Sequence, residues 1–289
     1  MMKKGPLKGL LCLNCLLLLL SACGSVSNPD AAVDRLQLKM GMSEEWVGQT
    51  GSVLARYPNR TQLSIALVEH DEVLFYGASR QNDTLRTVKN ATAVFEIGSL
   101  SKVFTSTLLA QLASQSKLDL DDSIQACLEF PLHNGIEITF RQLANHTSGL
   151  PRIPSGLILE SLFHMDNPYR DYNEEKLRSY LTEKMELKSE PGTTYRYSNI
   201  GAGLLGFVLA RATGMTYEKL LQDRIFKPLG MPNSTTTRAN IEGKLVPGLT
   251  KRGHPAENWD LGALPGAGAV LSTAEDLSRF AMANFDPAH

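Results

Sequence analysis

The sequence contains little cysteine, little tryptophan and no excess of one charge. Its 289 residues include four cysteines and two tryptophans, and 29 basic residues nearly balance 30 acidic ones. A chain without a basic excess has no general electrostatic attraction to nucleic acid, so we expect no nucleic-acid partner. Three of the cysteines lie in the first 23 residues. Only Cys127 follows them, which excludes a disulfide within the rest of the chain.

Several signatures of known catalytic sites are also absent. None of the six histidines begins a His-Glu-x-x-His motif, so we expect no metal. The Gly-x-Ser-x-Gly elbow of α/β hydrolases does not occur, and neither does a glycine-rich phosphate loop of the Walker type. The sequence therefore predicts no cofactor, and any catalysis has to come from its own side chains.

A hydrophobic run from Leu10 to Leu20 lies at the N-terminus, after three lysines and no acid. It is too short to span a membrane and is typical of a signal peptide. The run ends in Leu20-Ser21-Ala22-Cys23, which resembles the bacterial lipobox, although an ordinary cleavage site with a chance cysteine is an alternative. We expect a signal peptide over 1–22, lipid on Cys23 and a tether over 23–44. The resemblance implies a membrane partner and a protein in the bacterial envelope facing the periplasm, with Gly24 favouring the outer membrane.

The hydrophobic periodicity of the remaining chain predicts an α+β domain over 45–289, with a sheet part at 45–98 and a mainly helical part at 99–289. Residues 62–70 and 73–77 alternate as the two strands of a hairpin. An apolar helix over 200–213 ends at Gly214, and a second helix runs from Thr216 to Phe226. Ser272-Thr273-Ala274-Glu275 fits a capping box and begins a last helix to about Asn284.

The most informative motif is Ser99-Leu100-Ser101-Lys102, where a helical pattern begins. Residues three apart lie on one face of a helix, so the lysine nitrogen can reach the serine hydroxyl. A serine needs such a base to become a nucleophile, and lysine serves when its pKa is lowered. A solvated helix cap explains the same four residues. The extended run at 95–97, Gly98 and the apolar positions that follow favour a serine at a buried helix start.

A second motif, Tyr197-Ser198-Asn199, directly precedes the apolar helix. In a cleft with a serine nucleophile, a phenol can relay a proton and a carboxamide can bind a substrate amide. The alternative is a packed tyrosine with Asn199 as helix N-cap. His146, in the turn-rich segment 145–151, could act as a general base, but turn formation accounts for its neighbours. We therefore interpret His146 as structural.

Together these segments resemble the serine β-lactamase and penicillin-binding protein superfamily, and within it the class C β-lactamase-like group. The resemblance covers about residues 45–285 and rests on segments in the family's order: 95–102 (FEIGSLSK), 146–151 (HTSGLP), 197–199 (YSN), 225–231 (IFKPLGM) and 266–272. It implies an antiparallel sheet flanked by helices, with Ser99 as the acylated nucleophile. Lys102 would be its proton partner, Tyr197 a second general acid or base, and Asn199 a substrate-amide contact.

The sequence departs from that family at one point. The family's third motif, Lys-Thr-Gly or His-x-Gly, follows the segment that matches 266–272, and here it does not occur; Lys251-Arg252-Gly253 precedes that segment. The motif's strand would supply an oxyanion donor, and losing one donor costs about 100- to 1000-fold in rate. We expect the C-terminal strands to be missing, about two strands with exposed apolar faces to remain, and the chain to be truncated and poorly active.

The leading hypothesis is a serine hydrolase that forms an acyl-enzyme through Ser99. Its substrates would be β-lactams, D-Ala-D-Ala peptides derived from peptidoglycan, or related esters and amides. The alternative is a lipid-anchored protein that binds peptidoglycan or a β-lactam without turnover, or an inactive truncated product. The presence of Ser99, Lys102, Tyr197 and Asn199 favours the hydrolase. The sequence indicates no oligomeric state.

Overall fold

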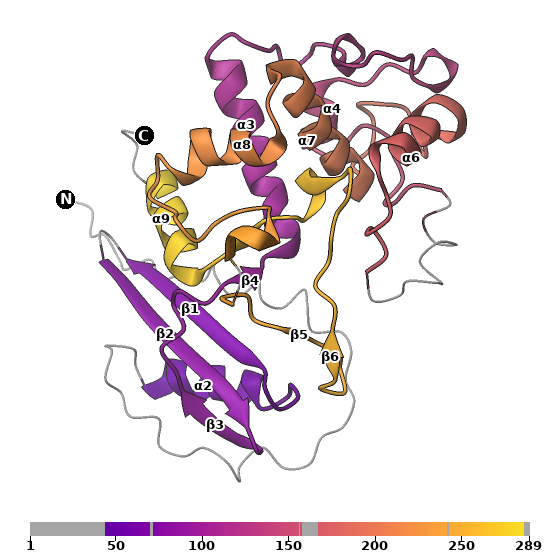
Figure 1. Cartoon of the computed structure of the whole chain (residues 1–289). Helices are drawn as coiled ribbons and strands as arrows, with labels where there is room; N and C mark the ends of the chain where they lie inside the picture. The colour runs from indigo at the N-terminus through magenta and orange to yellow at the C-terminus, as the bar shows by residue number, and fades with distance from the viewer. Residues whose placement is uncertain (1–43, 70–71, 156, 158–166, 242, 286–289) are drawn as a thin grey trace, which may run out of the picture.

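An antiparallel sheet and a larger helical region make up the part of the chain that the computed structural model describes, residues 44–69, 72–155, 157, 167–241 and 243–285 (Figure 1). The sheet region contains α2 Glu44–Leu54, β1 Gln62–Glu69, β2 Glu72–Gln81, β3 Thr84–Thr87 and β4 Phe95–Glu96. The helices that follow are α3 Ser101–Ser114, α4 Phe140–Ala144, α6 Glu174–Ser179, α7 Asn199–Thr213, α8 Tyr217–Leu221 and α9 Ala274–Phe285. Three two-residue strands lie among them: β5 Gly248–Leu249, β6 Pro255–Ala256 and β7 Leu271–Ser272.

The predicted hairpin is confirmed, and the sheet is larger than expected. Strand β1 pairs antiparallel with β2 from Gln62–Ser79 to Glu69–Glu72, and β2 continues beyond the predicted end to pair with β3. Asn82 and Asp83 connect β2 to β3, and both have positive φ, 49° and 58°. Two left-handed residues match the twist of a tight hairpin, and asparagine and aspartate tolerate that conformation better than most residues. The pair does not stand out in sequence as Asn-Gly does.

One face of this sheet packs against α2. Tyr76 and Ala78 of β2 form a buried cluster with Val47 and Leu54 of α2, and apolar residues of β1 pack against it. We expected about two strands with exposed apolar faces. That prediction is wrong for this face, because α2 covers it. Burying one face against a helix gives the sheet a hydrophobic core that an isolated hairpin lacks.

The helical region is built around α3 and α7. The α7 residues Ile200, Leu204 and Leu209 are completely buried, in agreement with the apolar pattern of the sequence. The helix ends as predicted at Gly214, which caps it in the left-handed conformation at φ 65°. Thr216 caps α8 by accepting a hydrogen bond from the Lys219 N–H, also as predicted. A π-helical turn, Gln222–Phe226, continues α8 as far as Phe226.

The last helix begins one residue later than the predicted capping box requires. Thr273 Oγ1 accepts the hydrogen bond from the Asp276 N–H at 3.0 Å, so the capping residue is Thr273. Ser272 instead belongs to β7 and pairs with Phe95 of β4. Its side chain is hydrogen-bonded to Ser234 in the core. Tertiary pairing therefore takes Ser272 out of the helix, and α9 packs against β1 and β2.

The predicted signal peptide, the tether up to residue 43 and Cys23 lie outside the described residues. Within the described ranges, no helix is long and apolar enough to cross a membrane.

Candidate active site

Ser99 lies where strand β4 turns into helix α3. Gly98 has φ 53°, a left-handed conformation that glycine adopts without a steric penalty. Ser99 follows in a single 3-10 turn, Gly98–Leu100, that continues into α3. The serine is exposed, so the prediction of a buried helix start is wrong for this residue. Burial begins two residues later, at Ser101, and continues at Lys102, which is 9% exposed.

Lys102 connects Ser99 to a distant segment of the chain. Its Nζ donates to Ser99 Oγ at 3.2 Å and to the carbonyl oxygen of Ala267 at 2.6 Å. Burial lowers the pKa of Lys102, and the charge of Arg152 acts in the same direction, while contact with Tyr197 opposes them. A lysine with a lowered pKa is present more often as the free amine, which is the form that accepts a proton.

Tyr197 completes a triangle of polar atoms around the serine oxygen. Its hydroxyl donates to Ser99 Oγ at 2.6 Å, and Lys102 Nζ lies 4.9 Å from the centre of its ring. Burial alone would raise the pKa of Tyr197. Hydrogen bonds with Lys102 and Ser99, together with the charges of Lys102 and Arg152, outweigh burial, and the pKa is lowered. The structure thus brings together three side chains that the sequence singled out.

Asn199 is the first residue of α7 and does not cap it. The cap is Ser198, whose Oγ accepts from the Gly201 N–H at 2.9 Å. The Asn199 Nδ2 instead donates to the Tyr169 hydroxyl at 3.3 Å. The N-cap interpretation of Asn199 is therefore wrong, because the preceding serine fills that position and leaves the amide for a tertiary contact.

The segment 145–152 holds Tyr197 in place. The Arg196 N–H donates to the His146 carbonyl at 2.7 Å, and the Asn199 N–H donates to the Arg152 carbonyl at 2.8 Å. The His146 ring lies 4.8 Å from the ring of Tyr197, and its Nδ1 accepts from the Ser198 N–H. Burial and the charge of Lys102 lower the pKa of His146, which favours the neutral ring. His146 contacts Tyr197 and its neighbour, so its position matches the structural interpretation.

Several groups at the site were not identified from the sequence. The Ala267 carbonyl is a main-chain group and leaves no side-chain signal, although its segment is one of those that carry the resemblance. The rings of Tyr169 and Trp259 contact each other with centres 5.8 Å apart and planes tilted by 47°. The main-chain N–H of Trp259 donates to Glu96 Oε1 at 2.5 Å. Tyr169 and Trp259 lie in irregular segments, where no periodicity predicts the direction of a side chain.

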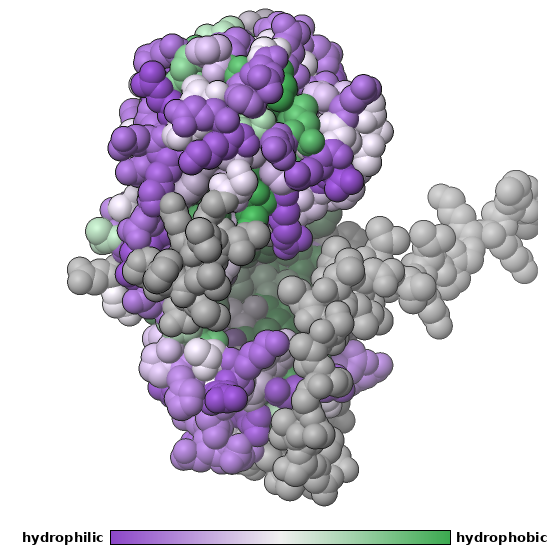
Figure 2. Space-filling view, turned by 90° about the vertical axis from the view of Figure 1, so that its right-hand side faces the viewer, coloured by the Kyte–Doolittle hydropathy of each residue, from purple (hydrophilic) through white to green (hydrophobic). Residues whose placement is uncertain are grey.

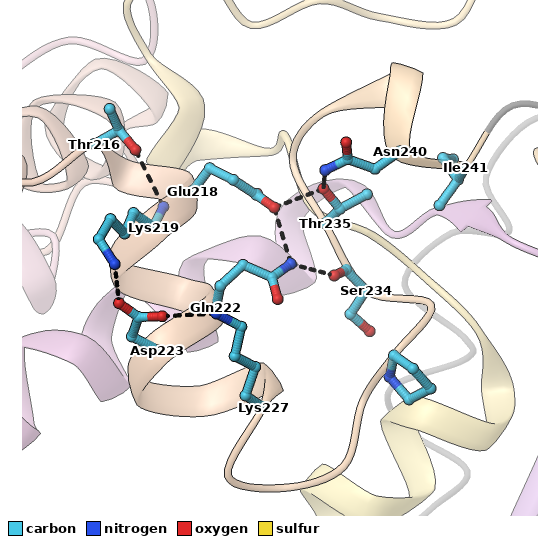
Figure 3. A pocket seen from close by; sticks show the side chains of 11 residues that line it. Thr216, Glu218, Lys219, Gln222, Asp223, Lys227, Ser234, Thr235, Asn240 and Ile241 are labelled. Atoms are coloured by element: carbon cyan, nitrogen blue, oxygen red, sulfur yellow. Dashed lines mark hydrogen bonds and ion pairs between the residues drawn. The ribbon is translucent and has the colours of Figure 1, made fainter.

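A pocket of about 460 Å³ lies apart from this site, along α8 (Figure 3). The Glu218 carboxylate accepts hydrogen bonds there from Thr235 and Thr236. Asp223 forms ion pairs with the Lys219 and Lys227 ammonium groups. The charged side chains named here thus have partners within the pocket: Asp223 has two lysines, and Glu218 has the hydroxyl groups of two threonines and the main-chain N–H of Thr236.

The molecule is hollowed between the helical part and the sheet part on the face seen in Figure 2, and hydrophobic residues lie inside the hollow. Among the described residues, Leu100 and Val103 are large apolar side chains beside the serine, and they are 54% and 49% exposed. The nucleophile is thus accompanied by apolar surface as well as by polar groups, which is the usual composition of a small-molecule site.

An antiparallel sheet and a helical region that meet at a Ser-x-x-Lys helix, with a tyrosine hydroxyl on the serine, define the class as the serine β-lactamase and penicillin-binding protein superfamily. The family model described as Beta-lactamase matches residues 52–289, and the chain belongs to that family. The family resemblance inferred from the sequence is thereby confirmed, and so is the predicted β-lactamase/transpeptidase-like fold.

Curated relatives and solved structures agree with this assignment. The chain is 32% identical to the D-alanyl-D-alanine-carboxypeptidase/endopeptidase AmpH of Escherichia coli, over 76% of this chain and 56% of that protein. It is 27% identical to a β-lactamase of Pseudomonas fluorescens, over 84% of this chain and 64% of that protein. The β-lactamase/D-alanine carboxypeptidase structure from Pseudomonas syringae matches with TM-score 0.67 and 27% identity, over 82% of this chain and 64% of that one. The chain thus spans little more than half the length of AmpH.

Proposed function

We propose that this chain is a serine hydrolase that forms an acyl-enzyme through Ser99. The observation that carries the proposal is the triangle in which Tyr197 Oη lies 2.6 Å and Lys102 Nζ 3.2 Å from Ser99 Oγ. Both partners have pKa values below their ordinary range, so both suit proton exchange with the serine nearer neutral pH.

In the proposed reaction, Ser99 Oγ attacks the carbonyl carbon of an amide or ester while its proton passes to the Lys102–Tyr197 pair. The carbonyl oxygen becomes an oxyanion, and the main-chain N–H of Ser99 is the donor that we propose to stabilise it. The pair then returns the proton to the leaving nitrogen or oxygen as the bond to carbon breaks. Water hydrolyses the resulting ester on Ser99 and regenerates the serine.

The substrates that we propose are β-lactams, D-Ala-D-Ala peptides and related esters or amides. Support comes from relatives whose names include D-alanyl-D-alanine-carboxypeptidase/endopeptidase and β-lactamase. The Asn199 amide, one residue beyond the helix cap and hydrogen-bonded to Tyr169, is the proposed contact for a substrate amide.

We further propose that residues 1–22 are a signal peptide, that Cys23 carries lipid and that residues 23–44 tether the 45–289 domain to the outer membrane, on its periplasmic side. The lipobox-like sequence at 20–23 supports this location. Replacing Cys23 by alanine is the direct test: lipid-dependent partition into detergent should be lost, and unchanged partition would contradict the anchor.

The first experiment is intact-mass analysis after incubation with a penicillin, on soluble protein that starts at residue 24 and whose folding is checked by circular dichroism. Wild type is expected to gain the mass of the penicillin, and Ser99→Ala is expected to stay unmodified. Ser106→Ala is a matched control on the same helix, and it should be acylated like wild type. Equal acylation of wild type and Ser99→Ala would refute Ser99 as the nucleophile, and no adduct on folded protein would favour the binding-protein alternative.

A further inference from the structure

The Arg152 guanidinium is an exposed cation at the edge of the candidate site. Its Cζ lies 5.2 Å from the ring centre of Tyr197, the phenol that contacts the nucleophile. The guanidinium contacts this ring, and no carboxylate of the described residues forms an ion pair with Arg152. The acid on the adjoining strand, Glu96, uses Oε1 to accept the Trp259 N–H.

The position of Arg152 is fixed by its backbone. Its carbonyl accepts from the Asn199 and Ile200 N–H groups at 2.8 and 3.4 Å, at the start of α7. The preceding carbonyl, of Pro151, accepts from Ser198 Oγ at 2.6 Å. These hydrogen bonds hold the backbone of Arg152 beside the loop that carries Tyr197. The side chain extends from this fixed backbone over the phenol ring.

The charge of Arg152 also reaches the neighbouring groups of the site. It acts to lower the pKa values of Lys102 and Tyr197, and it partly opposes the burial that raises the pKa of Tyr169. Since guanidinium forms planar, bidentate hydrogen bonds with carboxylates, an arginine beside a nucleophile that pairs with no carboxylate of the described residues suits an anionic substrate group.

We propose that Arg152 recognises a carboxylate on the substrate, so that this site prefers acyl donors that carry a negative charge near the scissile carbonyl. The inference rests on the proposed function and specifies its substrate class. Arg152 is in this view a specificity-determining residue, because it binds a part of the substrate that does not react. A negatively charged acyl group would be attracted by the Arg152 guanidinium and oriented by its plane.

The test compares two thioesters that differ only in charge, N-succinyl-D-alanyl thioester and its succinamide counterpart, by the rate of thiol release. Wild type should prefer the succinyl compound, and Arg152→Gln should lower its rate about tenfold while changing the rate for the succinamide little. Arg152→Lys should keep part of the preference. Arg196→Gln is the matched control, since Arg196 is an exposed arginine next to Tyr197, and it should keep the full preference.

Equal losses for both thioesters in Arg152→Gln would overturn the inference, since Arg152 would then act through Tyr197. Binding of the corresponding succinyl and succinamide amides to Ser99→Ala protein separates recognition from chemistry. We expect the succinyl amide to bind about tenfold more tightly, and Arg152→Gln in that background to remove the difference. Equal affinity for the two amides, or no binding of either, would overturn the proposal that Arg152 binds a carboxylate. A difference in affinity without any acylation of wild type would refute only the proposed acyl-enzyme.

Discussion

At the scale of single residues, the chemistry of the site depends on how burial changes two ordinary side chains. Ser99 is exposed, whereas the lysine that contacts it is almost completely buried. Removing an ammonium group from water favours its neutral form, and the nearby Arg152 adds repulsion. The pKa of the tyrosine is also lowered, because its cationic neighbours and hydrogen bonds favour the phenolate and outweigh burial. Both lowered pKa values suit proton exchange with the serine.

Lys102 should make both acylation and stability depend on pH. The rate of acylation is expected to fall as pH decreases, because protonation of the Lys102–Tyr197 pair removes the base. The pKa of Lys102 in the folded chain lies below its unfolded value of 10.5. The unfolded chain therefore binds more protons between these two values, and the free energy of unfolding should rise with pH across that interval.

Urea unfolding at several pH values checks the prediction, with Lys102→Met as the variant and Lys89→Met, at an exposed lysine, as the control. Lys102→Met should lose the rise in stability and the acylation, and Lys89→Met should keep both. An unchanged rise in stability in Lys102→Met would contradict a lowered pKa at this lysine.

At the scale of secondary-structure elements, the contact between α7 and the 3-10 turn Pro265–Ala267 positions the Ala267 carbonyl, which accepts a hydrogen bond from Lys102. A methyl group added at Gly206 would meet the Gly266 Cα at 3.0 Å and Gly266 N at 3.1 Å, both main-chain atoms. The next residue after Gly266 is Ala267, whose carbonyl accepts from Lys102. Close backbone packing of α7 therefore determines where that carbonyl lies.

Gly206→Ala is expected to destabilise the chain by about 1–3 kcal/mol, because a backbone cannot yield as a flexible side chain does. It should also slow acylation, since the Ala267 carbonyl would shift away from Lys102. Thermal unfolding and the rate of penicillin adduct formation measure the two effects. Gly48→Ala in α2 is the control: nothing lies within 4 Å of the added methyl group, and stability should stay equal or rise by about 0.5–1 kcal/mol. Equal stability of the two variants would refute the packing argument.

At the scale of the whole molecule, α9 joins the helical part to the sheet. It packs against β1 and β2, and its first turn contains Asp276, a completely buried carboxylate. Asp276 Oδ2 accepts from the Asn233 N–H and from Ser234 Oγ, each at 2.8 Å, and Arg279 approaches Oδ1. One carboxylate thus connects the loop after α8 to the helix that covers the sheet.

Asp276→Ala is expected to lower the free energy of unfolding by about 1–3 kcal/mol, because it leaves a buried N–H and a buried hydroxyl without their acceptor. Chemical denaturation followed by circular dichroism and by tryptophan fluorescence provides the measurement. Asp121→Ala removes an exposed carboxylate that pairs with Arg141, and it should leave stability nearly unchanged. A loss no larger than that of the control would mean that Asp276 does not connect the two parts.

The sequence by itself determined the local structure and the identity of the reactive groups. The spacing of Ser99 and Lys102, the apolar run after Asn199, the Gly214 stop and the Thr216 cap each follow from interactions between residues a few positions apart, which short-range rules describe. The same local rules failed where a distant segment competed. Ser272 pairs in a strand with β4 and leaves the cap to Thr273. The alternative in which Asn199 caps α7 was wrong for a local reason, because the adjacent Ser198 is the cap.

Only the tertiary structure decided which distant groups meet the serine. Tyr197 lies 98 positions from Ser99, and the Ala267 carbonyl 165 positions from Lys102, yet both are in hydrogen-bond contact. The placement of Arg152 over Tyr197 and of Trp259 on Tyr169 likewise follows from the packing of loops on α7 and β4. Side chains in irregular segments have no periodicity to predict their direction, and main-chain carbonyls carry no residue-specific signal. The fold therefore determines the proton affinities of the site, because these depend on burial and on charges that come together only when the chain is folded.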